Sequence, residues 1–340
     1  MNSIYGYTEK QIKDYLISVG EKPFRASQIY EWLYRHKIKS FDEITNMKKS
    51  FIEILKRDFV LDRLQLVTRQ DSVDGTIKFL FRLNDGNLIE TVLMSHDYGY
   101  SVCVTTQVGC NMGCAFCASG MKKKLRNLET YEIVLQILSV SELADLRVSH
   151  VVVMGIGEPF DNYDNVLDFF KIINHPLGLE IGARHITVST CGLVNKIYDY
   201  ADFDLQVNLA ISLHAPNDEI RNQIMPINKA YPLAELKKAI AYYIAKTNRR
   251  VTLEYILLKD LNDTKVHANE LANLIHGMNV YINLIPYNEV KEKPFKRSTP
   301  EAMHAFYDQL KKRSLNVTLR KEQGGDIDAA CGQLRSKHIK

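Results

Sequence analysis

Three closely spaced cysteines constrain this chain more than any other feature of its sequence. Cys110, Cys114 and Cys117 have the spacing C-x3-C-x2-C within a segment of small and apolar residues. Three thiolates without a fourth nearby fit a four-iron cluster in which one iron stays open for an exchangeable ligand. A structural zinc site is the main alternative, but it normally uses a second pair of ligands, and none follows at matching spacing. Three unrelated cysteines are the remaining interpretation.

Length and composition are those of a globular protein with one large catalytic domain and an accessory domain. The chain has 340 residues, 46% of them hydrophobic, which is enough for a sizeable core. No apolar run could span a bilayer, and the N-terminus is charged where a signal peptide would be apolar, so we expect a cytoplasmic protein without membrane contact. Six cysteines in that compartment favour metal ligation or catalysis over structural disulfides. The net charge of +4 permits a polyanionic partner without requiring one.

Residues 1–62 are expected to form a small helical accessory domain. Apolar side chains recur at helical spacing over 9–19, 26–37 and 49–59. Basic residues outnumber acidic ones in this part of the chain, and tyrosine and tryptophan are interleaved with them. Such a surface could contact RNA phosphates and stack on bases, although a solvated helical face would have the same composition.

Residues 63–98 change to the two-residue period of β-structure. Two alternating runs, 76–83 and 88–94, flank the turn sequence Asn-Asp-Gly, which predicts a β-hairpin extension. Glu90 lies within the second run. A lone acidic residue in a strand most often faces water, so the hairpin alone assigns it no function.

From residue 99 to residue 322, expected strands alternate with expected helices. This order implies parallel βαβ units and predicts an α/β fold containing a partial (β/α)6 barrel. We expect strands at 101–107, 150–154, 185–189, 206–213, 251–257, 281–285 and 316–320, and helices at 163–173, 194–200, 233–245, 266–277 and 300–313. The active site of such a barrel lies at the carboxyl ends of its strands.

Glycines and polar residues follow several of these strands, so we expect them to share one rim of the barrel. They are Gly157 and Glu158 after the second strand, Ser189 at the end of the third, Ser212, Leu213 and His214 at the end of the fourth, and Asn288 beyond the sixth. Gly157 would let a ligand approach the backbone, and Glu158 could accept hydrogen bonds from an ammonium group. Each residue also has an ordinary structural explanation, and their shared location is the stronger signal.

The other three cysteines lie outside the C-x3-C-x2-C motif. Cys331 belongs to a C-terminal tail, residues 323–340, where it could be a nucleophile or acyl carrier, a fourth cluster ligand or a surface thiol. Cys103 lies on the first barrel strand, where a free cysteine is commonly buried as a small hydrophobic residue. Cys191 is interpreted as structural.

Two basic tracts, 122–126 and 291–297, fall on loops near the expected rim. Fixed positive charge there would attract a polyanionic substrate. Both tracts could equally be solvated loops.

Taken together, these segments resemble a known family. The cysteine motif, with Phe116 before its last cysteine, is similar to that of radical S-adenosylmethionine (SAM) enzymes. The sequences Gly-Ile-Gly-Glu-Pro at 155–159, Ser-Leu-His at 212–214 and Asp-Ile-Asp-Ala-Ala-Cys-Gly-Gln-Leu at 326–334 resemble the RlmN/Cfr family of radical SAM RNA adenine methyltransferases. This resemblance covers nearly the whole chain.

The resemblance implies two cofactors. It assigns a [4Fe–4S] cluster to Cys110, Cys114 and Cys117, with SAM on the open iron. The positions that match the family's SAM contacts are Gly157, Glu158, Ser189, Ser212, Leu213, His214 and Asn288. An external one-electron reductant of the flavodoxin or ferredoxin type is also implied, and we expect a monomer.

The resemblance also implies a reaction at C2 of adenine. Cys331 would carry the methyl group, Cys103 would close a transient disulfide with it, and Glu90 would accept the ring proton. C2 is electron-poor and its hydrogen is not acidic, so a radical route supplied by the cofactors is required. The implied substrates are an adenosine of the peptidyl-transferase centre of 23S rRNA and the adenosine next to the tRNA anticodon, single-stranded or extruded.

Some residues help to choose between the branches of this family, and two alternatives lie outside it. Pro159 favours the branch that methylates C2 over the branch that methylates C8, whereas Ile156 and residues 118–120 depart from the commonest form without touching a matched chemical group. A radical SAM enzyme that acts on a protein and a zinc or RNA-binding module without activity are the alternatives from other classes.

Overall fold

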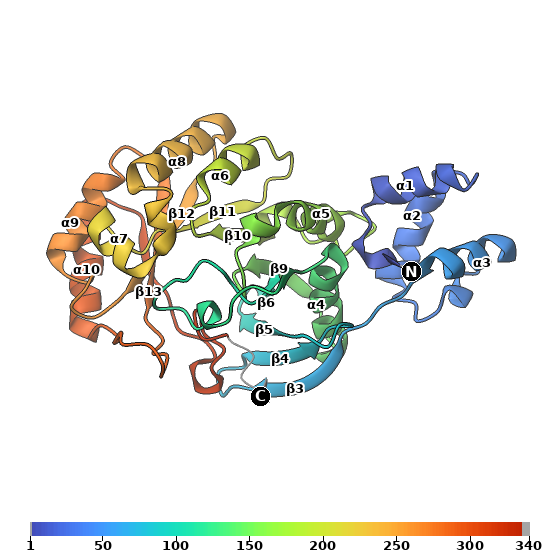
Figure 1. Cartoon of the computed structure of the whole chain (residues 1–340), viewed down its shortest axis with the longest axis horizontal. Helices are drawn as coiled ribbons and strands as arrows, with labels where there is room; N and C mark the ends of the chain where they lie inside the picture. The colour runs from blue at the N-terminus through green and yellow to red at the C-terminus, as the bar shows by residue number, and fades with distance from the viewer. Residues whose placement is uncertain (1, 335–340) are drawn as a thin grey trace.

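A ten-stranded sheet organises the part of the chain that this computed structural model describes, residues 2–334 (Figure 1). Its strand order is β14-β13-β12-β11-β10-β9-β6-β5-β4-β3. The bounds are β3 (Gln65–Asp71), β4 (Ile77–Arg82), β5 (Leu88–His96), β6 (Gly99–Cys103), β9 (Val148–Val153), β10 (Ile186–Thr190), β11 (Asn208–Ser212), β12 (Val251–Leu257), β13 (Val280–Pro286) and β14 (Val317–Leu319). Positions 335–340 of the expected tail lie outside the described residues.

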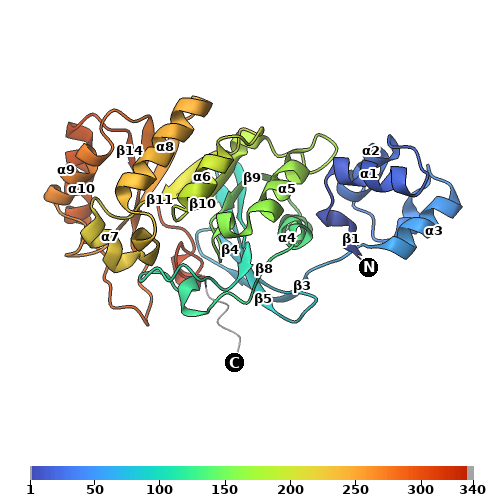
Figure 2. The same cartoon turned by 45° about the horizontal axis from the view of Figure 1, so that its top comes forward.

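The parallel part of the sheet is the barrel. Strands β6 and β9 to β14 pair in parallel, each with the next. Their connections carry α4 (Thr130–Leu143), α5 (Tyr163–Asn174), α6 (Val194–Tyr200), α7 (Asp218–Ile224), α8 (Leu233–Thr247), α9 (Lys265–Leu274) and α10 (Pro300–Lys312). All of these helices except α7 cover the outer face of the sheet (Figures 1 and 2). Helix α7 contacts the cysteine loop, where Ala115 N donates to Ile224 O at 2.8 Å. Because β14 and β3 form the two edges and do not pair within residues 2–334, the barrel is open. The expected α/β fold with a partial (β/α)6 barrel is confirmed.

Two helices, α4 and α7, were not expected from the sequence. Helix α4 is rich in β-branched residues, among them Ile133, Val134 and Ile137, which favour strands. It is buried on more than one face, so its apolar residues do not form the single stripe of a surface helix. Helix α7 has seven residues, and only Ile220 and Ile224 among them are apolar, so a single pair carries its helical period.

An antiparallel extension widens the sheet on the β6 side. The hairpin of β4 and β5 forms as expected, with Arg82 opposite Leu88 at its turn. Strand β5 then pairs with β6, which places Val92 opposite Cys103. Since alternate residues of a strand share a face, Glu90 points to the same side of the sheet as Val92 and Cys103.

The N-terminal helices lie at one end of the molecule (Figure 1). They are α1 (Glu9–Ser18), α2 (Arg25–Tyr30), which continues into a π-helical turn (Glu31–Arg35), and α3 (Lys49–Asp58). Two of the tyrosines in this part of the chain, Tyr30 and Tyr34, are buried and so do not present their rings for base stacking. Arg35 Nη2 donates to Pro176 O at 2.9 Å, which ties this part to the end of α5.

Within residues 2–334, the helices are too short or too polar for any of them to cross a membrane.

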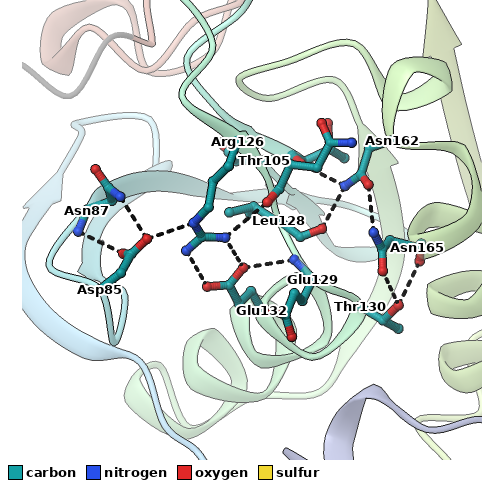
Figure 3. A network of polar contacts seen from close by, with 12 residues as sticks. Asp85, Asn87, Thr105, Arg126, Leu128, Glu129, Thr130, Glu132, Asn162 and Asn165 are labelled. Carbon is teal, nitrogen blue, oxygen red and sulfur yellow. Dashed lines mark hydrogen bonds and ion pairs between the residues drawn. The ribbon is translucent and has the colours of Figure 1, made fainter. Parts of the chain in front are cut away.

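A polar network joins the hairpin extension to the barrel (Figure 3). Arg126 donates to Asp85 at 2.7 Å and, through two nitrogens, to both carboxylate oxygens of Glu132, also at 2.7 Å. Asn162 donates to the carbonyls of Thr106 and Leu128 at 2.9 and 2.8 Å. The network therefore holds the segment after the cysteine loop against the start of α4.

Replacing Arg126 with methionine should lower the free energy of unfolding by about 2 kcal/mol, because the Glu132 carboxylate would remain buried without its partner. The cost stays below that of a fully buried pair because the guanidinium is partly exposed. Urea unfolding followed by circular dichroism measures the change. Lys238→Met, which breaks the exposed pair with Glu235, is the control and should leave the free energy of unfolding close to that of the wild type. Equal effects of the two substitutions would contradict the role of the network.

Candidate active site

The cysteine motif lies on a loop that is clamped at its base. Strands β7 (Gln107–Val108) and β8 (Arg126–Asn127) pair antiparallel on either side of it. Gly109 has φ +79°, and a Cβ there would lie 2.3 Å from the Lys123 carbonyl oxygen, so only glycine fits. Cys110 N donates to Lys122 O at 3.1 Å, which closes the loop.

The thiols of Cys110, Cys114 and Cys117 line one cavity of about 160 Å³ at the carboxyl ends of the strands. Burial raises the pKa of Cys110 to about 11. Burial, and then the neighbouring thiols of Cys117 and Cys110, raise the pKa of Cys114 well above its usual value. Without a positively charged ligand, the thiols of Cys110 and Cys114 would therefore stay protonated at neutral pH.

Gly157 and Glu158 form part of the wall of this cavity. Gly157 has φ +110°, and a Cβ would lie 2.6 Å from the Cβ of Gln107. The two Glu158 carboxylate oxygens accept from Phe160 N at 3.0 Å and Cys191 N at 2.7 Å. Burial raises the pKa of Glu158 despite these donors. The carboxylate is thus held rigidly, with lone pairs left for a cationic ligand.

The ends of β10 and β11 supply Ser189, Ser212 and His214 to the same cavity. The two serine Oγ atoms lie 3.3 Å apart. His214 Nδ1 accepts from Ile256 N at 3.1 Å, so the neutral ring carries its proton on Nε2. Burial lowers the pKa of His214 to about 3. Leu213, by contrast, is buried in the hydrophobic core beside Leu233.

A smaller cavity of about 70 Å³ is lined by Cys103, Cys331, Asn288 and Cys117. Asn288 Nδ2 donates to Cys331 O at 3.4 Å. Burial raises the pKa of Cys103 to about 12. All six cysteines are free, so Cys103 and Cys331 do not form a disulfide in this structure.

The tail that carries Cys331 packs directly on the cysteine loop. Ala118 N donates to Gly332 O at 2.8 Å, and Ser119 Oγ donates to Leu334 O at 2.8 Å. These bonds bring two parts of the chain more than 200 residues apart in sequence into one site. Cys331 also lines the larger cavity with the three motif cysteines.

Comparison with known proteins agrees with this site. Residues 104–271 match the radical SAM superfamily, and residues 2–61 match the ribosomal RNA large subunit methyltransferase N-terminal domain. Proteins of Listeria welshimeri and Oceanobacillus iheyensis, each named probable dual-specificity RNA methyltransferase RlmN, are 58% identical to this chain over its full length and over 95% and 98% of theirs. The chain belongs to the RlmN family of radical SAM methyltransferases.

A solved structure supports the same assignment for the fold. The crystal structure of a radical SAM methyltransferase from Sphaerobacter thermophilus has a TM-score of 0.92 and 41% identity, over 98% of this chain and 99% of that one. The family and enzyme class expected from the sequence are therefore confirmed: the chain is a radical SAM methyltransferase.

The residues fit the cofactors of the RlmN family by donor chemistry. Thiols that share one cavity suit an iron–sulfur cluster, because thiolates are the ligands such clusters use. Residues 2–334 contain no preformed group of three or more His, Cys, Asp or Glu side chains that could hold a metal ion. The fit between these residues and a cluster therefore rests on two observations: the side chains are thiols, and they line the same cavity.

Glu90 lies apart from the two cysteine-lined cavities. It is buried on β5 and lines a third cavity of about 200 Å³, together with Lys78 and tail residues Asp326 and Asp328. Thr105 Oγ1 donates to the Glu90 backbone oxygen at 2.6 Å, which fixes this part of the strand.

Three charged residues of the site region were not expected from the sequence. Arg221, fully buried, donates to the carbonyls of Leu213 and Cys191 at 3.1 and 2.7 Å, which joins the ends of two barrel strands. Arg320 Nη1 lies 3.2 Å from Cys331 Sγ, and Lys78 lies beside Glu90. The sequence contained a signal for two of them. Lys78 is a cation inside an apolar strand, and Arg320 directly follows β14.

The two basic tracts are partly neutralised. Lys124 pairs with Asp161 at 2.5 Å, Lys296 pairs with Glu289 at 3.0 Å, and Arg297 pairs with Glu322. Lys122 and Lys123 are exposed beside the cysteine loop. These two lysines are the part of the first tract best placed to meet an anion.

In cluster-free folded protein at pH 8, iodoacetamide should label Cys103 at least about tenfold more slowly than Cys331, because the thiolate is the reactive form. Burial holds the pKa of Cys103 near 12, whereas Cys331 is only half-buried. Peptide mass spectrometry over time measures both rates. In urea the two rates should converge, and equal rates in the folded protein would contradict the buried position of Cys103.

Proposed function

We propose that this chain methylates C2 of adenine in 23S rRNA, at an adenosine of the peptidyl-transferase centre, and in tRNA, at the adenosine next to the anticodon. The observation that carries the proposal is full-length similarity to proteins named for dual-specificity RNA methylation, joined to a site in which a tail cysteine lies against the cysteine loop. The proposed enzyme is cytoplasmic and monomeric, and a reductant of the flavodoxin or ferredoxin type supplies its electrons.

The cavity walls have the chemistry to hold the cofactors. Cys110, Cys114 and Cys117 would ligate a [4Fe–4S] cluster. The SAM contacts would come from Gly157, Glu158, Ser189, Ser212, His214 and Asn288, with the backbone of Leu213. When bound, cluster and SAM supply the methyl group and the radical chemistry that an unactivated C–H bond requires. The buried Glu158 carboxylate would bind the SAM ammonium group.

The chain's own residues then perform three tasks. Cys331 Sγ receives the methyl group and holds its carbon against C2. Glu90 accepts the C2 proton. Cys103 attacks Cys331 Sγ, so that an S–S bond forms and the S–C bond breaks with its electron pair going to carbon. The proton given up by the Cys103 thiol balances the one that completes the methyl group, and the methylated base leaves. The transient disulfide belongs to this last step, which is consistent with free thiols in the structure.

Arg320 supports the carrier role of Cys331. Its Nη1 donates to Cys331 Sγ at 3.2 Å, so the sulfur that would carry the methyl group is held in a fixed position. Adenine C2 is stacked in an RNA helix, so the substrate adenosine would have to be unpaired or extruded to reach this enclosed cavity.

The experiment that tests the proposal is an anaerobic assay of reconstituted protein with SAM, a reductant and transcribed ribosomal and transfer RNA fragments. Nucleoside mass spectrometry should detect 2-methyladenosine in both RNAs. A product of 8-methyladenosine would place the chain in the C8 branch of the family. No methyladenosine in either RNA would contradict the proposal and favour a protein substrate.

Replacing Cys331 with alanine should lower methyladenosine formation by at least about 10³-fold, because the methyl carrier is removed. Iron and acid-labile sulfide should stay at the wild-type content, since Cys331 is not a proposed cluster ligand. The same preparation serves both measurements. Full methyl transfer by the variant would contradict the carrier role, and loss of the cluster would identify Cys331 as a ligand.

A further inference from the structure

Lys78 is a buried lysine on β4 that lies between the tail and Glu90. Its Nζ donates to Ile327 O at 2.6 Å and to Asp328 O at 3.3 Å. The same Nζ lies 3.7 Å from Glu90 Oε1, and both side chains are less than a tenth exposed. A buried ammonium group of this kind is held only where charge and hydrogen bonds compensate it.

The strand register explains why Lys78 can serve both partners. Lys78 is opposite Val92 and Leu80 is opposite Glu90 in the β4–β5 pair, so Lys78 and Glu90 are diagonal neighbours on one face. Val92 is in turn opposite Cys103 in the β5–β6 pair. Lys78, Glu90 and Cys103 therefore project from three adjacent strands toward the side on which the tail lies.

The β3–β4 turn anchors the tail independently of Lys78. Ser72 Oγ donates to Asp326 Oδ1 at 2.5 Å, and Gly324 N donates to Asp74 Oδ2 at 2.8 Å. Gly324 has φ +65°, and a Cβ there would lie 2.9 Å from Thr76 Cγ2, so the tail passes close to the strand. Figure 1 shows the tail in red beside β3 and β4. Lys78 contacts the tail between this anchor and Cys331.

We infer that Lys78 is a positioning residue that orients Glu90 for proton removal and links that orientation to the docked tail. In the step concerned, the C2 proton moves to a Glu90 carboxylate oxygen and its bonding electron pair stays with the ring. The inference rests on the proposed function, because it gives Glu90 that proton. The tail carbonyls hold the ammonium group at ion-pair distance from Glu90, so Glu90 is aligned when the carrier segment is in place.

The test measures how bound RNA partitions between two products. If proton removal is slow, RNA that has bonded to the Cys331 methyl carbon accumulates as a protein–RNA adduct before release. Lys78→Met should raise the ratio of adduct to released 2-methyladenosine at least about tenfold, because a displaced catalytic group slows its own step. Lys78→Arg, which keeps the charge, should return the ratio to within about threefold of wild type.

Ser72→Ala is the matched control for tail docking. It removes a tail anchor that does not touch Glu90, so the sum of adduct and product should fall while their ratio stays at the wild-type value. Gel shift under denaturing conditions quantifies adduct, and nucleoside mass spectrometry quantifies product. An unchanged ratio in Lys78→Met, or the same ratio change in Ser72→Ala, would overturn the inference.

A double substitution separates orientation from general damage. Glu90→Gln alone should accumulate adduct, and adding Lys78→Met should leave the ratio unchanged, because both substitutions act on one step. Independent, additive effects would show that Lys78 acts elsewhere. Lys78→Gln is measured in parallel. The iron content of each variant confirms that the variant is folded. Absence of methyladenosine with wild-type protein would instead contradict the proposed function itself.

Discussion

Parallel pairing of β6 with β9 and of β9 through β13 is the constraint on which the site depends. The backbone hydrogen bonds of this ladder bring the carboxyl ends of the strands to one rim. Residues that are far apart in sequence, such as Cys110, Glu158 and His214, then line one cavity. Glycines, small polar residues and thiols share the wall of this cavity with large apolar side chains such as Phe116 and Met225.

This arrangement buries charged side chains, which costs free energy. Hydrogen bonds to backbone groups offset much of that cost. Arg221 has no exposed surface and bonds to several carbonyls and to Asn228 Oδ1 at 2.9 Å. Glu158 uses two backbone N–H groups, and Lys78 uses two backbone carbonyls. Partners on the backbone cannot titrate, so these hydrogen bonds do not depend on the protonation state of a neighbour.

The sequence could predict the features that arise from local patterns. Alternation of apolar residues predicted β12 with its bounds, and the ends of the strands predicted where Gly157, Ser189 and Ser212 would lie. It could not predict α4, whose β-branched residues pack on several sides. It also could not predict the contact of Lys78 with Ile327, since that contact joins positions 249 residues apart and exists only because the tail returns to the hairpin. The position of Glu90 in a separate cavity from Cys103 has the same origin.

The tail makes contacts with the β3–β4 turn, with the cysteine loop and with Arg320. A ribosome delivers these residues after the strands and the cysteine loop, and domains fold as they are synthesised. During synthesis the cavity that contains Cys103 is therefore without the segment that carries Cys331. The site is therefore completed only after the strands that frame it, so a premature stop codon before Cys331 would leave these strands without the carrier.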